Sequence, residues 1–209
     1  MKSENSVNTI IVSNREMEPS KIICVGRNYI EHIKELNSEI PEDMVIFFKP
    51  NSAISQELNS FQIEQIHYEA ELCFVYEKGR FAAVGFGLDL TKRELQNRLK
   101  TKGLPWERAK AFDGSALFSK FVEIQSINPY LSIELSINGI NVQSGNINQM
   151  IYKPDAILTE LQTFMSLNDG DIVMTGTPKG VGIVNVGSVL VGKVIENKEV
   201  LISAEWIAK

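Results

Sequence analysis

The stretch that decides the fold runs from residue 67 to residue 75 and reads His67-Tyr68-Glu69-Ala70-Glu71-Leu72-Cys73-Phe74-Val75. Side chains along a strand alternate between faces, so His67, Glu69 and Glu71 are expected on one face. The apolar residues 72–75 fill both faces, which is typical of a strand covered on both sides. Carboxylates buried there cost free energy unless they are paired, hydrogen-bonded or bound to a metal. An isolated Glu-x-Glu pair is more often a solvated strand end, so the surrounding sequence must decide.

Composition narrows the class of protein. The chain has 209 residues, of which 44% are hydrophobic and 22% charged, which is enough for a substantial core. Its net charge of −5 argues against a nucleic-acid or anionic-membrane binder. No apolar run approaches the roughly 18 residues that span a bilayer, and the N-terminus lacks a signal-peptide core. We therefore expect a cytoplasmic protein without nucleic-acid or membrane partners, and with Cys24 and Cys73 as reduced, buried thiols.

The rest of the chain reads as short strands with few helices. Asn28 is a plausible N-cap for a short helix over residues 28–36, and a polar loop follows over residues 37–43. Helical patterns recur over residues 91–99 and 152–164, and Asn138-Gly139 predicts a hairpin turn. Strands are expected at residues 21–26, 45–49, 131–137 and 171–174, and around Val189 and Leu201. Without repeats or linkers, we expect one domain over residues 1–209, with residues 1–19 as an N-terminal strand and lead-in segment.

Two histidines are present, and one of them has a carboxylate at helical spacing. His32 lies three residues before Glu35, so the two side chains can meet on one helical face. A carboxylate that orients an imidazole supports it as a general base. In isolation such a pair is more often an ordinary surface pair. His67 is interpreted as a strand-end or supporting residue.

Asp89 ends an apolar, glycine-containing strand and is a candidate third ligand beside Glu69 and Glu71. It could equally cap the helix that begins near Thr91. Three carboxylates without a Cys or His ligand favour Mg²⁺ or Mn²⁺ over zinc. Such a site leaves coordination positions for a chelating substrate and water.

The glycine-rich run Thr175-Gly176-Thr177-Pro178-Lys179-Gly180-Val181-Gly182 lacks the order of a phosphate-binding loop, and Gly85-x-Gly87 lacks a dinucleotide fingerprint. We exclude both nucleotide interpretations. A turn that presents a hydroxyl and backbone N–H groups to an anion remains open.

Together these segments resemble the fumarylacetoacetate hydrolase family, in particular its short acylpyruvase and oxaloacetate decarboxylase members. Each block is weak alone, but their order and spacing hold from about residue 20 to the C-terminus. The early blocks are Val25-Gly26-Arg27-Asn28-Tyr29-x-x-His32-x-x-Glu35, Phe48-Lys49-Pro50 and Tyr68-Glu69-x-Glu71-Leu72. The later blocks are Leu88-Asp89-Leu90-Thr91-x-Arg93-x-x-Gln96, Gly103-Leu104-Pro105-Trp106-x-x-Ala109-Lys110, Asn138-Gly139 and Gly170-Asp171-x-x-x-Thr175-Gly176-Thr177-Pro178-x-Gly180-Val181-Gly182. Residues 113–117 depart from the family pattern, where a proline is common.

The resemblance implies a fold and a role for each matched position. The fold is α+β but mainly β, a mixed β-sandwich or roll of the family's C-terminal-domain type with a few short helices. Glu69, Glu71 and Asp89 correspond to metal ligands for Mg²⁺, with Mn²⁺ as the alternative. The implied catalytic residues are His32 and Glu35 on a mobile lid helix, and Lys110. The implied substrate-binding residues are Arg27, Lys49, Arg93, Gln96 and Thr177.

The implied activity is that of a metal-dependent hydrolase or lyase. It would cleave the C3–C4 bond of short acylpyruvates, decarboxylate oxaloacetate, or do both, through a pyruvate enolate held by the metal. The alternative is an isomerase or hydratase that acts on an unsaturated 2-oxo dicarboxylate. A non-catalytic binding protein is disfavoured, because it would have no need to keep the dyad, the lysine and the three acids together. The expected partner is a small 2-oxo acid, and the resemblance also implies a homodimer.

Overall fold

The computed structural model describes residues 7–209. Its main element is a seven-stranded sheet with the spatial order β10-β9-β8-β14-β3-β4, in which β11 pairs with a further part of β9. Only β14 and β3 run parallel in this sheet. The strands are β3 (Lys21–Gly26), β4 (Val45–Pro50), β8 (Ala70–Glu77), β9 (Arg80–Asp89), β10 (Ala116–Phe118), β11 (Val122–Glu123) and β14 (Ile172–Met174). Residues 1–6 of the expected N-terminal segment lie outside the described residues.

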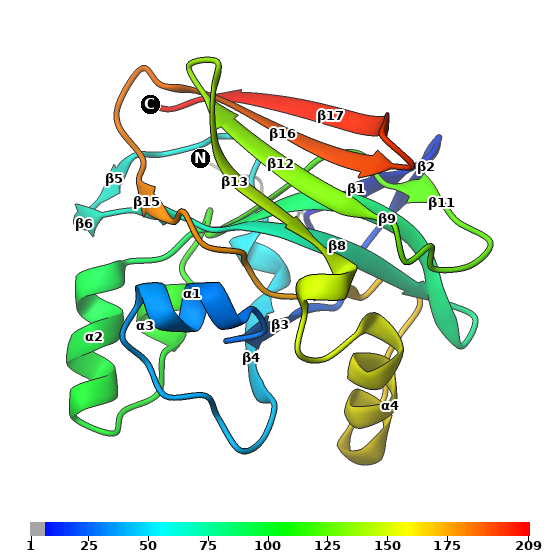
Figure 1. The fold of residues 1–209 in the computed structure, drawn as a ribbon, viewed down its shortest axis with the longest axis horizontal. Helices are drawn as coiled ribbons and strands as arrows, with labels where there is room; N and C mark the ends of the chain where they lie inside the picture. Colours follow the sequence, from blue (N-terminus) through cyan, green and yellow to red (C-terminus); the bar gives the residue numbers. More distant parts are fainter. Residues whose placement is uncertain (1–6) are drawn as a thin grey trace.

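A second, four-stranded antiparallel sheet lies above the large one (Figure 1). Its order is β13-β12-β16-β17, with β12 (Ser132–Ile137), β13 (Ile140–Asn146), β16 (Val189–Glu196) and β17 (Glu199–Ile207). Asn138 and Gly139 join β12 to β13 with φ values of 51° and 82°. The hairpin turn expected from this dipeptide is therefore confirmed.

The main core lies between the two sheets. Phe86 of β9 meets Trp206 of β17 with ring centroids 6.0 Å apart, and Phe74 and Leu190 belong to the same buried cluster. The sheets approach closely at Gly192, where an added Cβ would lie 2.3 Å from the Phe86 ring. Burial of each large apolar side chain contributes about 1.5–3 kcal/mol. The expected mainly-β fold with a few helices is confirmed.

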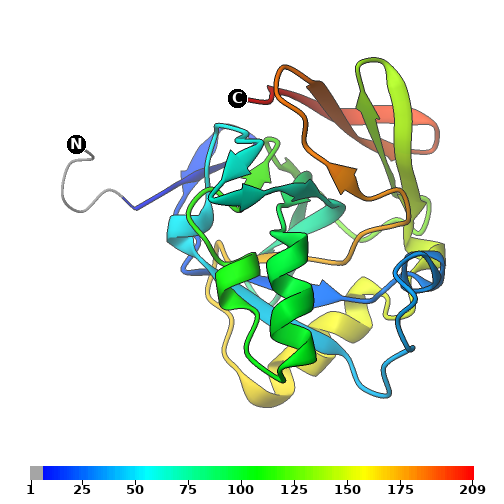
Figure 2. The same ribbon diagram turned by 90° about the vertical axis from the view of Figure 1, so that its left-hand side faces the viewer.

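The helices lie on the other side of the large sheet from the four-stranded sheet, which both ribbon views show (Figures 1 and 2). They are α1 (Ile30–Glu35), α2 (Arg93–Thr101), α3 (Glu107–Lys110) and α4 (Pro154–Phe164), with 3-10 turns at Asn51–Ala53 and Ile147–Gln149. Small two-stranded pairings complete the fold: β1 (Ile10–Val12) with β2 (Arg15–Met17), β5 (Phe61–Gln62) with β6 (Glu64–Gln65), and β7 (His67–Tyr68) with β15 (Gly182–Ile183). Within residues 7–209, no helix has the length and apolar character needed to cross a bilayer.

Residues 67–75 form two strands, β7 and β8, with a break at Glu69, where a single strand was expected, but their side chains alternate between the faces as predicted. Tyr68, Leu72 and Phe74 enter the core between the sheets, whereas Cys73 and Val75 enter a second cluster on the other face of the large sheet. Both free cysteines are buried, as predicted.

Asn28 corrects one local prediction. It is not the N-cap of α1, because Tyr29 holds that position without a side-chain cap. The Asn28 side chain is fully buried and donates to the carbonyls of Tyr152 (2.9 Å) and Thr175 (2.8 Å). Its Oδ1 accepts from the Tyr152 N–H at 2.7 Å. These partners lie far along the chain, so no local pattern reveals them.

The start of α2 also differs from the expected residue. The backbone N–H and carbonyl of Thr91 bond to His67, at 3.0 and 2.8 Å, which keeps Thr91 in a strand-like bridge. The helix therefore begins at Arg93, two residues later than the pattern predicts.

Candidate active site

Three buried carboxylates meet at one edge of the large sheet. Strands β3, β9 and β14 end at this edge and β8 begins there, as their registers require. Glu69 precedes β8, Glu71 lies on it, and Asp89 is the last residue of β9. One oxygen from each of the three lies within 4.8 Å of the others. The tertiary structure thus brings together the three acids that the sequence suggested as ligands.

Three cationic side chains compensate part of this negative charge: Lys110, Arg93 and Lys49. Lys110 Nζ donates to Glu69 Oε2 (2.8 Å), Asp89 Oδ2 (2.7 Å) and Thr91 Oγ1 (2.6 Å). Arg93 forms an ion pair with Glu69 and donates to Gln96 Oε1 at 2.8 Å. Burial opposes ionisation of Glu69, but Lys110 and Arg93 outweigh it and hold the pKa of this carboxyl well below its ordinary value. Glu69 is therefore ionised at neutral pH.

Glu71 has a different environment. Among the described residues its carboxylate accepts one hydrogen bond, from the Gly176 N–H at 2.6 Å. Burial, together with nearby Asp89 and Glu69, raises the pKa of the Glu71 carboxyl well above its ordinary value. Gly176 has a φ of 99°, and an added Cβ would lie 2.9 Å from the Val25 carbonyl oxygen, so glycine is required at this close approach.

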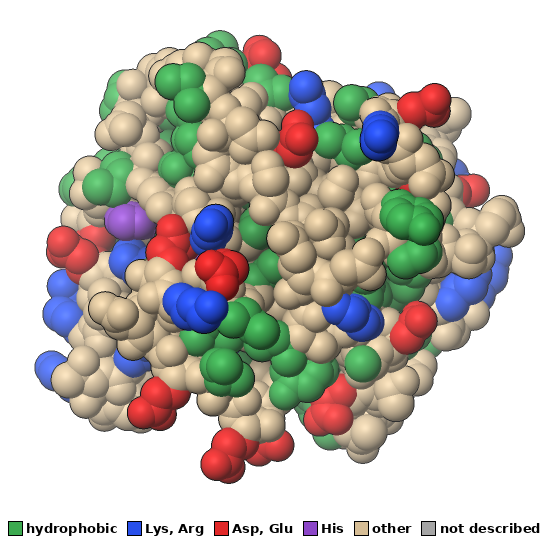
Figure 3. All heavy atoms as spheres, viewed as in Figure 1, with side chains coloured by type: hydrophobic (Ala, Val, Ile, Leu, Met, Phe, Trp, Pro, Cys, Tyr) green, Lys and Arg blue, Asp and Glu red, His purple; other side chains and the backbone are tan. Residues whose placement is uncertain are grey.

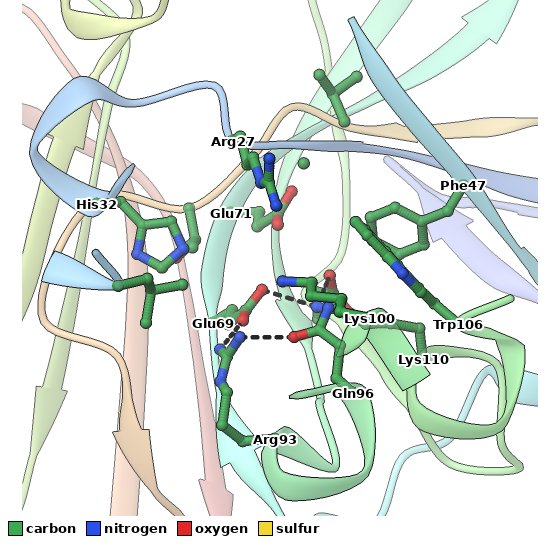
Figure 4. Close-up of a pocket in the computed structure, with 15 residues that line it drawn as sticks. Arg27, His32, Phe47, Glu69, Glu71, Arg93, Gln96, Lys100, Trp106 and Lys110 are labelled. Carbon is green, nitrogen blue, oxygen red and sulfur yellow. Dashed lines mark hydrogen bonds and ion pairs between the residues drawn. The ribbon is translucent and has the colours of Figure 1, made fainter. Parts of the chain in front are cut away.

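This donor set fits a hard divalent cation. The carboxylate oxygens converge in a buried place, and one of the three acids lacks a cationic side chain as hydrogen-bond partner among residues 7–209. Oxygen ligands of this kind suit Mg²⁺ or Mn²⁺. Figure 4 shows the carboxylates of Glu69 and Glu71 directed into the same pocket.

Lys49 lies beneath the acids and outside the pocket lining. It is fully buried, with Nζ 2.8 Å from Asp89 Oδ1 and a further hydrogen bond to the Lys110 carbonyl. The sequence suggested a contact between Lys49 and substrate. In the structure Lys49 contacts Asp89 and the last residue of α3, and it does not line the pocket.

The His32–Glu35 pair lies across the pocket from these groups. His32 is buried, and its Nδ1 lies 3.1 Å from Glu35 Oε2. Glu35 Oε1 accepts from the Gly180 N–H at 2.9 Å, which fastens α1 to the glycine-rich loop. Among residues 7–209, Nε2 of His32 has no hydrogen-bond partner. An imidazole held in this way can exchange a proton through Nε2.

A pocket opens between these side chains. Of the residues that the sequence placed in it, Arg27, Arg93, Gln96 and Thr177 line the wall together with His32, Lys110 and the three acids. Arg27 has a φ of 55°, an uncommon backbone conformation for a residue with a side chain. Thr177 Oγ1 accepts from Gln143 Nε2 at 2.9 Å. Sequence reasoning gave no site role to six further lining residues: Val25, Gly26, Leu36, Phe47, Lys100 and Trp106.

Sequence patterns could have identified some of these additional lining residues but not others. Lys100 follows Gln96 by four positions on α2, so helical spacing places both on one face. Trp106 lies within the block of residues 103–110, which is one of the segments that resemble the family. Phe47 left no signal, because residues 45–48 of its strand are all apolar and only the pairing of β4 with β3 turns it towards the pocket.

Comparison with known proteins agrees with this architecture. The model of the fumarylacetoacetate (FAA) hydrolase C-terminal family matches residues 21–204. The chain therefore belongs to the fumarylacetoacetate hydrolase family.

Two relatives and one solved structure show which members of the family the chain is similar to. The chain is 38% identical to the oxaloacetate tautomerase YcgM of Escherichia coli over 189 residues, which cover 82% of this chain and 86% of the relative. It is 37% identical to the mitochondrial oxaloacetate decarboxylase of Dictyostelium discoideum, covering 81% and 86% of the two chains. The crystal structure of fumarylpyruvate hydrolase from Pseudomonas aeruginosa, in complex with Mn²⁺ and pyruvate, superposes with a TM-score of 0.89. That pair is 27% identical, and the match covers 99% of this chain and 97% of the other.

Proposed function

We propose that this chain is a divalent-metal-dependent enzyme that acts on short 2-oxo acids, with oxaloacetate as the principal substrate. The observation that carries the proposal is that His32, held by Glu35, and the acid triad line one pocket. The relatives named for oxaloacetate tautomerisation and decarboxylation support the choice of substrate. Both reactions move an electron pair from a bond at C3 into the C2–C3 bond and place negative charge on the C2 oxygen, so one site can serve both.

The residues of the chain have separate tasks in tautomerisation. His32 Nε2 would remove a proton from C3 of oxaloacetate, and the electron pair of that C–H bond would form the C2–C3 double bond. The C2 oxygen gains negative charge, which the Lys110 ammonium would offset. The proton that His32 took from C3 is then delivered to that oxygen, which gives the enol and frees His32, and the reverse sequence restores the keto form. Glu35 would orient His32 and stabilise its protonated ring.

Decarboxylation differs only in the bond that breaks. The C3–C4 electron pair forms the C2–C3 double bond of a pyruvate enolate, CO₂ leaves, and a proton transferred from the protonated His32 ring to C3 gives pyruvate. A divalent cation held by Glu69, Glu71 and Asp89 would supply Lewis acidity for the carboxylate and keto oxygens of the substrate. Arg93, Gln96 and Thr177 would bind and orient the substrate, and Lys49 would hold Asp89.

Hydrolysis of acylpyruvates is a second candidate, favoured by the same dyad and by the likeness to fumarylpyruvate hydrolase. Here His32 would take a proton from water, whose oxygen attacks C4. Collapse of the adduct breaks the C3–C4 bond and releases a carboxylic acid and a pyruvate enolate, which His32 reprotonates at C3. An isomerase or hydratase that acts on an unsaturated 2-oxo dicarboxylate is the alternative activity. Isomerisation would use the same proton transfer through His32.

The first test measures three activities of the purified protein: oxaloacetate tautomerisation, oxaloacetate decarboxylation and acetylpyruvate hydrolysis. Each is assayed with Mg²⁺, with Mn²⁺ and after treatment with EDTA. We expect tautomerisation to be fastest and all three to stop with EDTA. Turnover that survives complete removal of metal would contradict the proposal.

His32→Ala tests the base. We expect tautomerisation and hydrolysis to fall by roughly 10²–10⁴-fold, because each needs a proton transfer to the imidazole, and decarboxylation to fall less. Glu31→Gln is the matched control, since Glu31 lies on the same helix, is exposed and, among residues 7–209, forms its ion pair with Lys34. Equal losses in all three activities would argue against a proton-transfer role for His32.

We further propose that residues 1–209 act as one catalytic domain and that the protein is a homodimer, as the family resemblance implies. Light scattering of the purified protein tests the second point: a monomeric mass would contradict it.

A further inference from the structure

Lys100 extends into the pocket from the last turn of α2 (Figure 4). It also lines a second, outer pocket together with Glu35 and Leu36 of the α1 region. The Lys100 side chain therefore lies at the boundary between the two pockets. A substrate whose first end lies at the acid triad would direct its other end towards this boundary.

Some of the cationic side chains that line the pocket are paired with acids and others are not. Its lining contains four cationic side chains and three acidic ones. Lys110 and Arg93 are occupied by ion pairs with the acids. In the part of the chain that the structure describes, Lys100 and Arg27 have no acidic side chain within ion-pair distance. The pocket thus retains positive charge that an anion can meet.

An aromatic wall fixes the position of Lys100. Its Nζ lies 4.8 Å from the ring centroid of Trp106, and Trp106 in turn packs against Phe47 with centroids 6.0 Å apart. A cation over an aromatic face is attracted to the ring and loses rotamer freedom before any ligand arrives. Lys100 is therefore preorganised, and its ammonium has no carboxylate partner of its own.

We propose that Lys100 binds the distal carboxylate of a dicarboxylic 2-oxo acid and thereby makes the site prefer oxaloacetate to substrates that end in a neutral group. The inference rests on the proposed function, since it takes the acid triad as the binding place of the 2-oxo acid end. Lys100 acts here as a specificity-determining residue and takes no part in bond making.

The electrostatic state of Lys100 supports this assignment. Burial, and then the positive charges of Arg27, Arg93 and Lys110, lower the pKa of the Lys100 ammonium to about 8. The protein thus holds this cation at a cost that a bound carboxylate would relieve. By thermodynamic linkage, a bound carboxylate raises the pKa of the Lys100 ammonium, and the affinity for that carboxylate is highest where Lys100 is protonated.

The test compares two ligands that differ only in the distal carboxylate. Malate and lactate are titrated calorimetrically into the protein in the presence of Mg²⁺, which requires no turnover. We expect the wild-type protein to bind malate at least about tenfold more tightly. In Lys100→Met, malate affinity should fall about tenfold while lactate affinity changes less than about twofold.

Two further variants complete the design. Lys102→Met removes an exposed lysine just beyond α2 and should leave both affinities unchanged. Lys100→Gln replaces Lys100→Met if the latter fails to fold, as judged by circular dichroism and thermal melting. Wild-type protein that binds malate no more tightly than lactate would overturn the inference without any variant.

The remaining outcomes separate the two proposals. Equal losses for malate and lactate in Lys100→Met, or no loss for either, would overturn the role of Lys100 alone. A malate preference that depends on Lys100, in a protein that turns over neither oxaloacetate nor acetylpyruvate, would overturn the proposed function and support this inference.

Discussion

At the scale of single residues, the environment of each charged side chain decides what it does. Lys49, Lys100 and Lys110 all lie near the acid triad, yet one is sealed beneath Asp89, one faces the pocket, and one bridges two acids. Their residue type does not distinguish them. The burial and the partners of each lysine distinguish them, because a buried ammonium needs a fixed acceptor whereas a partly exposed ammonium remains available to a ligand.

The pocket lysine leads to a prediction about pH. Only the ammonium form of Lys100 binds a carboxylate, and its pKa of about 8 means that the proton is lost as the pH rises through this value. Burial opposes the charge on Lys110, but Asp89 and Glu69 outweigh it and raise the pKa of this ammonium, so it remains protonated. We expect malate affinity to be full below pH 8 and to decline above it, with little decline for lactate.

Calorimetric titrations between pH 6 and pH 10 check this prediction. Lys100→Arg serves as the control, because a guanidinium keeps its charge over the whole range and should abolish the decline. A malate affinity that stays constant to pH 10 in the wild-type protein would show that Lys100 does not carry the effect.

At the scale of elements, the site depends on joints between strands and helices. Helix α1 has only six residues and no side-chain cap, so its own hydrogen bonds cannot hold it. Asn28 anchors its start to the segment before α4 and to the end of β14. Glu35 anchors its end to the loop at Gly180. His32 is thus positioned by contacts at both ends of α1.

Asn28→Ala tests the first of these anchors. The substitution leaves the N–H and carbonyl of Tyr152 and the carbonyl of Thr175 without their partners in a buried place. We expect a loss of about 2–5 kcal/mol in the free energy of unfolding, measured by urea denaturation. Asn97→Ala, at an exposed position of α2, should change it by less than about 0.5 kcal/mol. An Asn28→Ala protein as stable as wild type would contradict the anchoring role.

Local patterns predicted most elements but not their joints. The dipeptide Asn138-Gly139 and the alternation over residues 131–137 predicted a hairpin that the structure confirms, because turn chemistry and strand period are local properties. The role of Asn28 as a joint, and the bridge at Thr91 that delays α2, depend on segments distant in sequence. Helical spacing and capping preferences carry no information about such partners.

At the scale of the whole molecule, the proposed metal links elements that are far apart in the chain. Its three candidate ligands come from the start of β8 and the end of β9, and Gly176 after β14 contacts one of them. A ligand that binds only the folded state stabilises the entire fold by mass action. The global stability of the protein should therefore report occupancy of this one site.

We expect saturating Mg²⁺ to raise the melting temperature. At one hundred times the dissociation constant the gain is about 2.7 kcal/mol, or roughly 5–10 °C for a domain of this size. Glu71→Gln should lose most of this shift, since it removes one anionic ligand. Glu77→Gln at the far end of β8 should keep it. A wild-type melting temperature that neither Mg²⁺ nor Mn²⁺ changes would contradict a metal site at the triad.

The sequence by itself determined the mainly-β class, the family and the residue types of the site. Strand period, turn dipeptides and motif spacing all lie within short windows or in a fixed order along the chain. It also singled out Glu69, Glu71 and Asp89 as possible ligands. Their roles in binding a metal remain a prediction.

Only the tertiary structure decided how these residues meet. The strand registers bring Asp89 to the glutamates, turn Phe47 towards the pocket and place Lys49 beneath it. Packing of α2 against α3 sets Lys100 over Trp106 and leaves it without an acidic partner among residues 7–209. The reason is physical: burial and charge pairing depend on distances between segments that are remote in sequence, and no local pattern encodes those distances.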